Sequence, residues 1–192
     1  HAAWVYKSGA NYSLRYSNNV SGAWAAATTL ESAGAKQLSN VTLAVDVYNQ
    51  VHLLYLYHDS SSVKSVKYRY RTRAGGWVTD ALILGQGSDP TPVIAADKRG
   101  SVYAAWVKNN DIMTAVSDSK AWSEPVNITN STDYSLYPAL APDRYGFMNL
   151  FWSEVSGSNN IIKASMFYDG QWLAPVKVGN GQSGGGAQQF TS

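Results

Sequence analysis

Hydrophobic and polar positions alternate along this chain in short runs, and the runs are separated by turns rich in Gly, Asn, Asp and Ser. Alternation with a period of two is typical of β-strands, whereas an amphipathic helix needs a period of about 3.6 residues. No stretch shows a convincing helical period, and β-branched and aromatic residues dominate the runs. The pattern therefore predicts an all-β fold.

The pattern also repeats along the chain around three aspartates. Asp46, Asp97 and Asp143 each follow a short apolar run and precede a turn and a second apolar run. The first two aspartates are 51 residues apart and the last two are 46 residues apart. A third strand follows each time, and then a fourth that begins near a Trp. Four-stranded units of about 40–50 residues are typical of β-propeller blades.

We therefore predict a β-propeller with four visible four-stranded blades, at approximately residues 1–40, 41–89, 90–135 and 136–183. By this register the first blade lacks its innermost strand. Two alternatives stay open: a closed four-bladed ring, in which the Gly-rich tail at residues 184–192 supplies the closing strand, or a fragment of a larger propeller. The Trp residues are interpreted as filler between blades rather than as platforms on which a sugar stacks.

Composition narrows the class of protein. The 192-residue chain has no Cys, which excludes disulfide-stapled mini-proteins and thiolate zinc sites. Its formal net charge is only +2, and five of the fifteen basic residues lie within residues 64–73, so a uniformly basic nucleic-acid binder is not indicated. The sequence shows neither an apolar run long enough to span a membrane nor a visible signal peptide. We expect no membrane span and no nucleic-acid partner.

At these repeats the sequence resembles the sialidase-like, BNR-repeat β-propellers, and the resemblance covers nearly the whole chain. The hallmark of that family is the Asp-box, Ser-x-Asp-x-Gly-x-Thr-Trp. Here it is degenerate, because the segment from Ser17 to Trp24 keeps Ser, Gly and Trp but has Asn19 in place of the Asp. The resemblance implies a propeller fold and favours carbohydrate as the ligand class. The Arg-Ile-Pro motif of the family's sialidases does not occur, so no catalytic residue is assigned.

One candidate binding rim lies near the ends of the predicted second strands. Its members are Tyr6, Tyr57, His58, Lys108 and Glu154. The register of the repeat places these positions on the same edge of the propeller, where they could bind a polyhydroxylated ligand. The alternative is an ordinary solvated loop edge.

A second candidate is the strand around residues 67–71, in which basic and aromatic side chains alternate. Lys67, Arg69, Arg71 and Arg73 would share one face. This indicates a docking strip for an anionic glycan or another polyanion. The alternative is charge placed near a sheet edge to prevent edge-to-edge pairing.

The histidines do not predict a metal centre or a cofactor. A copper-binding brace at His1 would need a second His on a β-sandwich, and the blade repeat argues against that fold. His52 is interpreted as a packed or partly exposed strand residue. A metal at His58 would need more ligands than the sequence shows around it.

Taken with the resemblance, these features lead us to expect a secreted or surface-displayed scaffold that recognises a glycan. Two alternatives stay open. One is a glycoside hydrolase whose catalytic groups lie partly outside this chain, with Glu154 or a neighbouring carboxylate taking part. The other is a structural module that pairs through blade edges, either by self-association or with the missing blades of a longer chain.

Overall fold

The computed structural model describes residues 1–78, 81–88, 90–118 and 121–181. These residues form β-strands and no helix, so the all-β prediction is confirmed. In chain order the strands are β1 (Ala2–Ser8), β2 (Asn11–Ser17), β3 (Thr28–Gly34), β4 (Leu38–Val45), β5 (Val51–His58), β6 (Lys64–Arg71), β7 (Leu82–Gly87), β8 (Val93–Ala96), β9 (Val102–Lys108), β10 (Asp111–Ser117), β11 (Val126–Asn127), β12 (Tyr134–Pro142), β13 (Met148–Ser156), β14 (Asn159–Tyr168), β15 (Gln171–Trp172) and β16 (Val176–Asn180).

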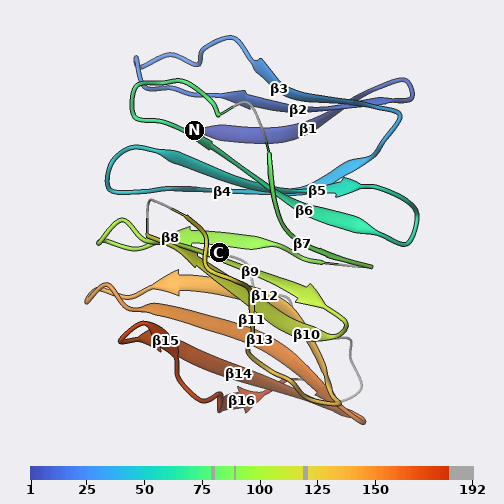
Figure 1. Ribbon diagram of the computed structural model, residues 1–192, viewed down its shortest axis with the longest axis vertical. Coiled ribbons are helices and arrows are strands. Elements are labelled where there is room, and N and C mark those ends of the chain that lie inside the picture. Colours follow the sequence, from blue (N-terminus) through green and yellow to red (C-terminus); the bar gives the residue numbers. More distant parts are fainter. Residues whose placement is uncertain (79–80, 89, 119–120, 182–192) are drawn as a thin grey trace.

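The strands form four antiparallel sheets that follow one another along the chain (Figure 1). The first sheet has the order β1-β2-β3, the second β4-β5-β6-β7 and the third β8-β9-β10-β11. The fourth has the order β12-β13-β14-β15, and β16 also pairs with β14. The first sheet begins at the strand equivalent to β5, as the repeat register predicted. The four-strand unit therefore holds for the second and third sheets, whereas the first sheet has three strands and the fourth has five.

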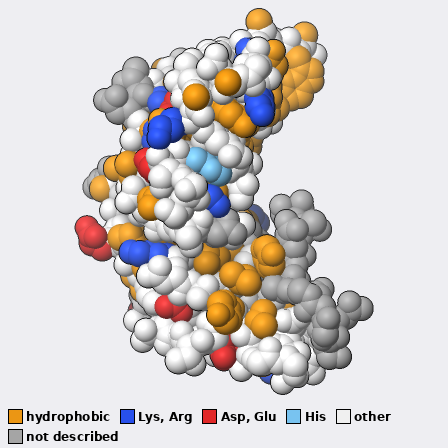
Figure 2. Space-filling view, turned by 90° about the vertical axis from the view of Figure 1, so that its right-hand side faces the viewer, with side chains coloured by type: hydrophobic (Ala, Val, Ile, Leu, Met, Phe, Trp, Pro, Cys, Tyr) orange, Lys and Arg blue, Asp and Glu red, His pale blue; other side chains and the backbone are white. Residues whose placement is uncertain are grey.

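The sheets lie side by side in an open arc. Neighbouring inner strands contact one another, β1 with β4, β4 with β8 and β8 with β12. Figure 1 shows the sheets stacked in chain order, and Figure 2 shows the outline, which is hollowed on one side. A ring of four would need β12 to meet β1, but these strands lie toward opposite ends of the arc. The closed ring is therefore wrong for the described residues, and the tail at 184–192 lies outside them.

The turns at the repeated aspartates share one hydrogen-bonding pattern. In each turn Oδ1 of the aspartate accepts bonds from the backbone N–H groups two and four residues later. The residue three positions after the aspartate has a positive φ of 59° at Asn49, 90° at Gly100 and 89° at Gly146. Gly adopts this conformation without steric cost and Asn tolerates it. Each aspartate thus fixes the hairpin that joins the first two strands of its sheet.

Bulky rings at one repeated position fill the space between neighbouring sheets. Tyr55 in β5, Trp106 in β9 and Trp152 in β13 are each at most 1% exposed. Trp106 belongs to a core cluster formed by the second and third sheets, and Trp152 to one formed by the third and fourth. The interpretation of Trp as inter-blade filler is confirmed at these two positions. Burial of such large apolar surfaces is the main force that joins the sheets.

The first two Trp residues of the chain are exposed. Trp4 in β1 is 36% exposed and Trp24, in the turn before β3, is 59% exposed. No described sheet packs against either ring, so the filler interpretation stays a prediction for these two residues. Among the described residues there is also no helix with the length and apolar character needed to cross a bilayer.

Candidate functional site

A cleft of about 730 Å³ lies between the second and third sheets. One wall is formed by side chains of β5, β6 and β7, and the other by β9, β10 and the segment that follows Trp122. The floor lies near the Asp46 turn, on the edge of the arc opposite the β5–β6 hairpin. The site is therefore built where two neighbouring repeats meet.

Strand alternation decides which side chains reach this cleft. In β6 the even-numbered Tyr68 and Tyr70 face the third sheet, while Lys67 and Arg69 face the first. His52 in β5 is paired directly with Tyr70 across the ladder, so its ring lies on the same face. Two neighbouring strands thus contribute three rings to one wall.

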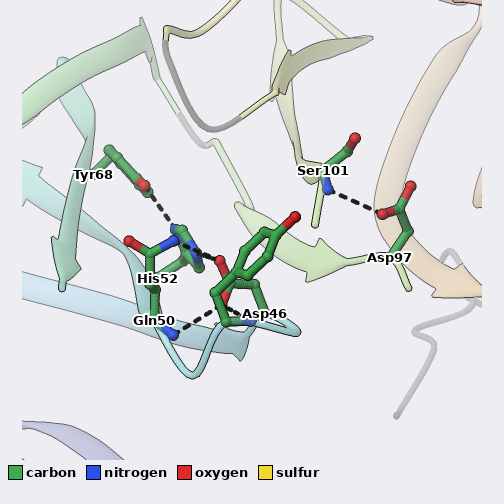
Figure 3. A network of polar contacts seen from close by, with 7 residues as sticks. Asp46, Gln50, His52, Tyr68, Asp97 and Ser101 are labelled. Carbon is green, nitrogen blue, oxygen red and sulfur yellow. Dashed lines mark hydrogen bonds and ion pairs between the residues drawn. The ribbon is translucent and has the colours of Figure 1, made fainter. Parts of the chain in front are cut away.

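A buried polar network runs along this wall (Figure 3). His52 lies between Asp46 and Tyr68: its Nε2 is 3.2 Å from Asp46 Oδ2 and its Nδ1 is 2.7 Å from the Tyr68 hydroxyl. An ionised carboxylate can only accept, so Nε2 donates to Asp46. The Nδ1 atom of the neutral ring then accepts from the Tyr68 hydroxyl. Gln50 Nε2 donates a further bond of 2.8 Å to Asp46 Oδ2.

The local environment fixes the charge of each member of the network. Burial raises the pKa of Asp46, but hydrogen bonds from Gln50, His52 and Tyr48 outweigh it and hold the pKa below its usual value. Burial lowers the pKa of His52 by more than Asp46 raises it. Burial also raises the pKa of the Tyr68 phenol. Near neutral pH the site therefore holds a carboxylate, a neutral imidazole and a protonated phenol.

The rings of the wall are almost parallel. The ring planes of His52, Tyr68 and Tyr70 lie within 18° of one another, and their centroids are 6.0 to 6.2 Å apart. Trp122 from the third sheet meets Tyr68 edge-on, with centroids 4.9 Å apart. Similar Tyr–Trp contacts join the other sheets, at Tyr16 with Trp77 and at Tyr103 with Trp172. The Trp contact is thus part of the repeat, whereas the cluster of three nearly parallel rings belongs to this cleft.

The next pair of sheets provides an internal comparison. A cleft of about 450 Å³ lies between the third and fourth sheets, with Trp172 at the position of Trp122. Ladder register makes Thr114 and Val116 the equivalents of Tyr68 and Tyr70. The second cleft therefore has no equivalent of the cluster formed by His52, Tyr68 and Tyr70, and the first is the more specialised of the two.

The cleft can bind a ligand that combines an apolar face with hydroxyl groups. Tyr70 offers a partly exposed aromatic ring with a hydroxyl at the wall of the cleft, and the buried rings of His52 and Tyr68 lie beside it. Pockets with mostly apolar walls and a few placed polar groups are typical small-molecule sites. Among the described residues no group of three or more metal-ligating side chains occurs, so nothing in the cleft calls for a metal.

The predicted rim residues lie along the hairpin edge but on separate sheets. The hairpins that hold Tyr6, Tyr57, Lys108 and Glu154 are β1–β2, β5–β6, β9–β10 and β13–β14, so the shared edge is as expected. Each of these side chains lies in a different local environment. The Arg15 guanidinium carbon lies 3.7 Å from the Tyr6 ring centroid.

The remaining rim residues are similarly engaged. Lys67 Nζ lies 3.8 Å from the Tyr57 ring centroid, and His58 Nε2 lies 2.8 Å from Ser39 Oγ. Glu154 is 3% exposed and pairs with Lys163 at 2.5 Å. Lys108 is exposed. The structure thus places these residues on one edge without gathering them into one pocket, and their role in binding stays a prediction.

The basic residues of the predicted polyanion strip are divided between two environments. Lys67 Nζ and Arg69 Nη2 pair with Glu31 at 2.9 and 3.3 Å, between the first and second sheets. Burial raises the pKa of Glu31, but bonds from Lys67 and Tyr55 outweigh it and hold the pKa below its usual value. Arg71 ends β6 and Arg73 is exposed beyond it. The four cations therefore do not form one free strip.

Sequence reasoning did not select the residues that line the cleft. It correctly interpreted His52 as a packed strand residue, since this side chain is 5% exposed. It did not connect His52 with Asp46, although the two are six residues apart around the recognised turn. The Tyr68-x-Tyr70 pattern was also visible as one face of a strand. In the structure, the pairing of β5 with β6 places His52 beside the two tyrosines.

Comparisons with known proteins agree with the fold. No protein-family profile and no curated protein matches the chain. Among solved structures, the Hadza microbial sialidase Hz136 superposes with a TM-score of 0.57 at 14% identity, over 90% of this chain and 45% of its own. A protein of unknown function from Dyadobacter fermentans DSM 18053 gives a TM-score of 0.54 at 9% identity, over 73% of this chain and 55% of its own.

The chain thus spans about half the length of these two structures. At such low identity the structural similarity shows the fold alone. It indicates neither an Asp-box nor an activity for this chain. The four sheets of this chain are arranged as in a sialidase-like β-propeller.

Proposed function

We propose that this chain is a carbohydrate-recognition propeller, exported or displayed on a cell surface, that binds a glycan in the cleft between its second and third sheets. The observation that carries the proposal is the cluster of three nearly parallel rings from His52, Tyr68 and Tyr70, which is hydrogen-bonded to Asp46 through His52. The sialidase neighbour supports the proposal only through its fold.

The chemistry of the wall suits a sugar ring. A pyranose has a face of C–H groups and a rim of hydroxyls, and the electron-rich face of an aromatic ring attracts such C–H groups. The hydroxyl of the partly exposed Tyr70 can exchange hydrogen bonds with a sugar hydroxyl, whereas the Tyr68 hydroxyl is engaged by His52. The volume of about 730 Å³ is within the usual range for ligand sites.

The carboxylates favour recognition over hydrolysis. Glycoside hydrolysis needs two carboxyl groups that flank the scissile bond. Among the described residues, two carboxylates line the cleft: Asp46 already accepts bonds from two backbone amides, Gln50 and His52, and Glu124 lies exposed in the segment between β10 and β11. Glu154, the carboxylate considered for hydrolysis from the sequence, is buried and paired with Lys163. A binding role therefore agrees better with the described residues than a hydrolytic one.

The proposal predicts that binding depends on Tyr70, the partly exposed member of the ring cluster. A glycan array followed by calorimetry with a binding oligosaccharide measures this dependence. Tyr70→Ala removes one ring and is expected to weaken binding about tenfold or more, which corresponds to about 1.4 kcal/mol. Tyr70→Phe keeps the ring and is expected to bind within about threefold of the wild type, a difference below 1 kcal/mol.

Tyr145→Ala is the matched control, because Tyr145 is 64% exposed and lies in the turn between β12 and β13, outside the cleft. It is expected to leave the affinity unchanged. Silence of the wild type across the array, or equal losses in Tyr70→Ala and Tyr145→Ala, would refute glycan binding at this site.

A further inference from the structure

The cleft carries negative charge without a neutralising cation among its described lining residues. Its acidic side chains are Asp46 and Glu124. Asp46 is 5% exposed and its pKa is held below the usual value, so it is ionised at neutral pH. Its hydrogen-bond donors include no cationic side chain, because His52 is neutral there.

Arg69 is the one cation among the lining residues that the structure describes, and it directs its charge away from the cleft. Arg69 belongs to the wall, but its guanidinium lies on the opposite face of β6. There it donates to Glu31 at 3.3 Å and to the Tyr55 hydroxyl at 3.2 Å. Its side chain is 12% exposed, so this pairing occupies it in the space between the first and second sheets.

The cations beside Gly100, at the other end of the cleft, are also directed elsewhere. The guanidinium carbon of Arg99 lies 5.6 Å from the Phe147 ring centroid in the fourth sheet's turn. Lys98 Nζ donates a bond of 3.1 Å to the backbone oxygen of Arg144 in that same turn. Both side chains therefore extend toward the fourth sheet rather than into the cleft.

A ligand that enters the cleft consequently meets aromatic side chains, hydroxyl groups and the exposed Glu124 carboxylate, while the Asp46 carboxylate lies buried and hydrogen-bonded nearby. An anionic group would lose part of its hydration and gain no cationic partner, and like charges at short range repel strongly in a partly buried site. Neutral hydroxyls carry no such penalty. The arrangement also differs from a site that recognises carboxylates, where Arg provides paired donors.

We infer that this cleft selects neutral glycans and rejects those that carry a carboxylate or sulfate, an inference that rests on the proposed glycan-binding function. The residues responsible are Asp46 and Glu124 on the cleft side, together with the orientation of Arg69 toward Glu31.

The test uses a neutral oligosaccharide that binds on the array and the same oligosaccharide with a terminal sialic acid or a sulfate. Calorimetry of the wild type is expected to show at least tenfold weaker binding of each anionic form. The difference is expected to shrink as salt is raised, because exposed charges are screened. In Glu124→Lys the anionic forms are expected to gain at least threefold relative to the neutral form.

Val20→Lys is the control for added charge, since Val20 is 75% exposed and lies in the first sheet's turn. It is expected to leave the preference unchanged. Equal or tighter binding of the anionic forms to the wild type would overturn this inference and leave the proposed function standing. Failure of both neutral and anionic forms to bind would overturn both.

Discussion

At the scale of single residues, one very close contact between sheets lies at Gly85 in β7. A Cβ atom built on Gly85 would lie 2.6 Å from Trp106 Nε1 and 2.8 Å from Cε2 of the same ring. Distances of that size lie well inside van der Waals contact, and Trp106 is 1% exposed and held by both sheets. The close packing against Trp106 therefore requires Gly at position 85. The backbone conformation there would allow other residues.

This contact predicts that Gly85→Ala destabilises the protein. The added methyl group must displace a buried indole, and such overpacking costs about 1–3 kcal/mol. Urea unfolding measures the change in the free energy of unfolding. Gly179→Ala in β16 is the control, because a Cβ there meets nothing within 4 Å. If Gly85→Ala matched Gly179→Ala in stability, the close packing of Trp106 against β7 would be disproved.

At the scale of elements, β6 connects two different surfaces. Its face toward the first sheet carries Lys67 and Arg69, which pair with Glu31 of β3. Its other face carries the tyrosines that line the cleft. The ion pairs hold the first sheet against the second, and they also keep the Arg69 guanidinium out of the cleft. One strand thus contributes to both stability and the proposed ligand preference.

Glu31→Gln is expected to weaken the junction of the first two sheets. The amide cannot compensate the charges of Lys67 and Arg69, whose side chains are only 18% and 12% exposed. Leaving such groups without their charged partner costs about 1–3 kcal/mol. Thermal and urea unfolding measure the loss. Glu124→Gln, at an exposed carboxylate, is expected to change stability by less than about 0.5 kcal/mol, and equal effects of the two variants would contradict a structural role for Glu31.

At the scale of the whole molecule, stability is a sum over the junctions between neighbouring sheets. Tyr103 in β9 contributes to the junction of the third and fourth sheets, with its ring edge-on to Phe167 and Trp172. Its hydroxyl donates to Asp97 Oδ2 at 3.1 Å. Burial, followed by the charge and hydrogen bond of Asp97, raises the pKa of Tyr103 to about 12. The turn aspartate of the third sheet is thereby coupled to this interface.

This shift predicts a loss of stability in alkali. The folded state binds the phenol proton more tightly than the unfolded chain, whose tyrosine pKa is 10.0. The contribution is therefore fully present below pH 10 and is lost as the pH rises through about 12. Unfolding free energies measured from pH 8 to 12 are expected to fall across that window. The fall is expected to be smaller in Tyr103→Phe, and an identical pH dependence in the variant would contradict the assignment.

The all-β class, the repeat and the turns could be read from the sequence because they depend on local signals. Strand alternation has a period of two, and the turn at Asp46 is specified by residues within four positions of it. The recurrent Trp also indicated sheets that pack face to face. Whether the ring closes depends instead on how the first and last sheets are placed relative to each other. No local signal in the sequence specifies that placement.

The candidate site was harder to predict from the sequence, because it too depends on contacts between distant parts of the chain. The sequence determined that Tyr68 and Tyr70 share a face and that Asp46 opens a turn. Only the tertiary structure decided that His52 joins them, that Trp122 closes the opposite wall and that Arg69 turns toward Glu31. Local spacing fixes which way a side chain points within its strand, whereas the partners it meets are set by sheets that pack together from distant parts of the chain.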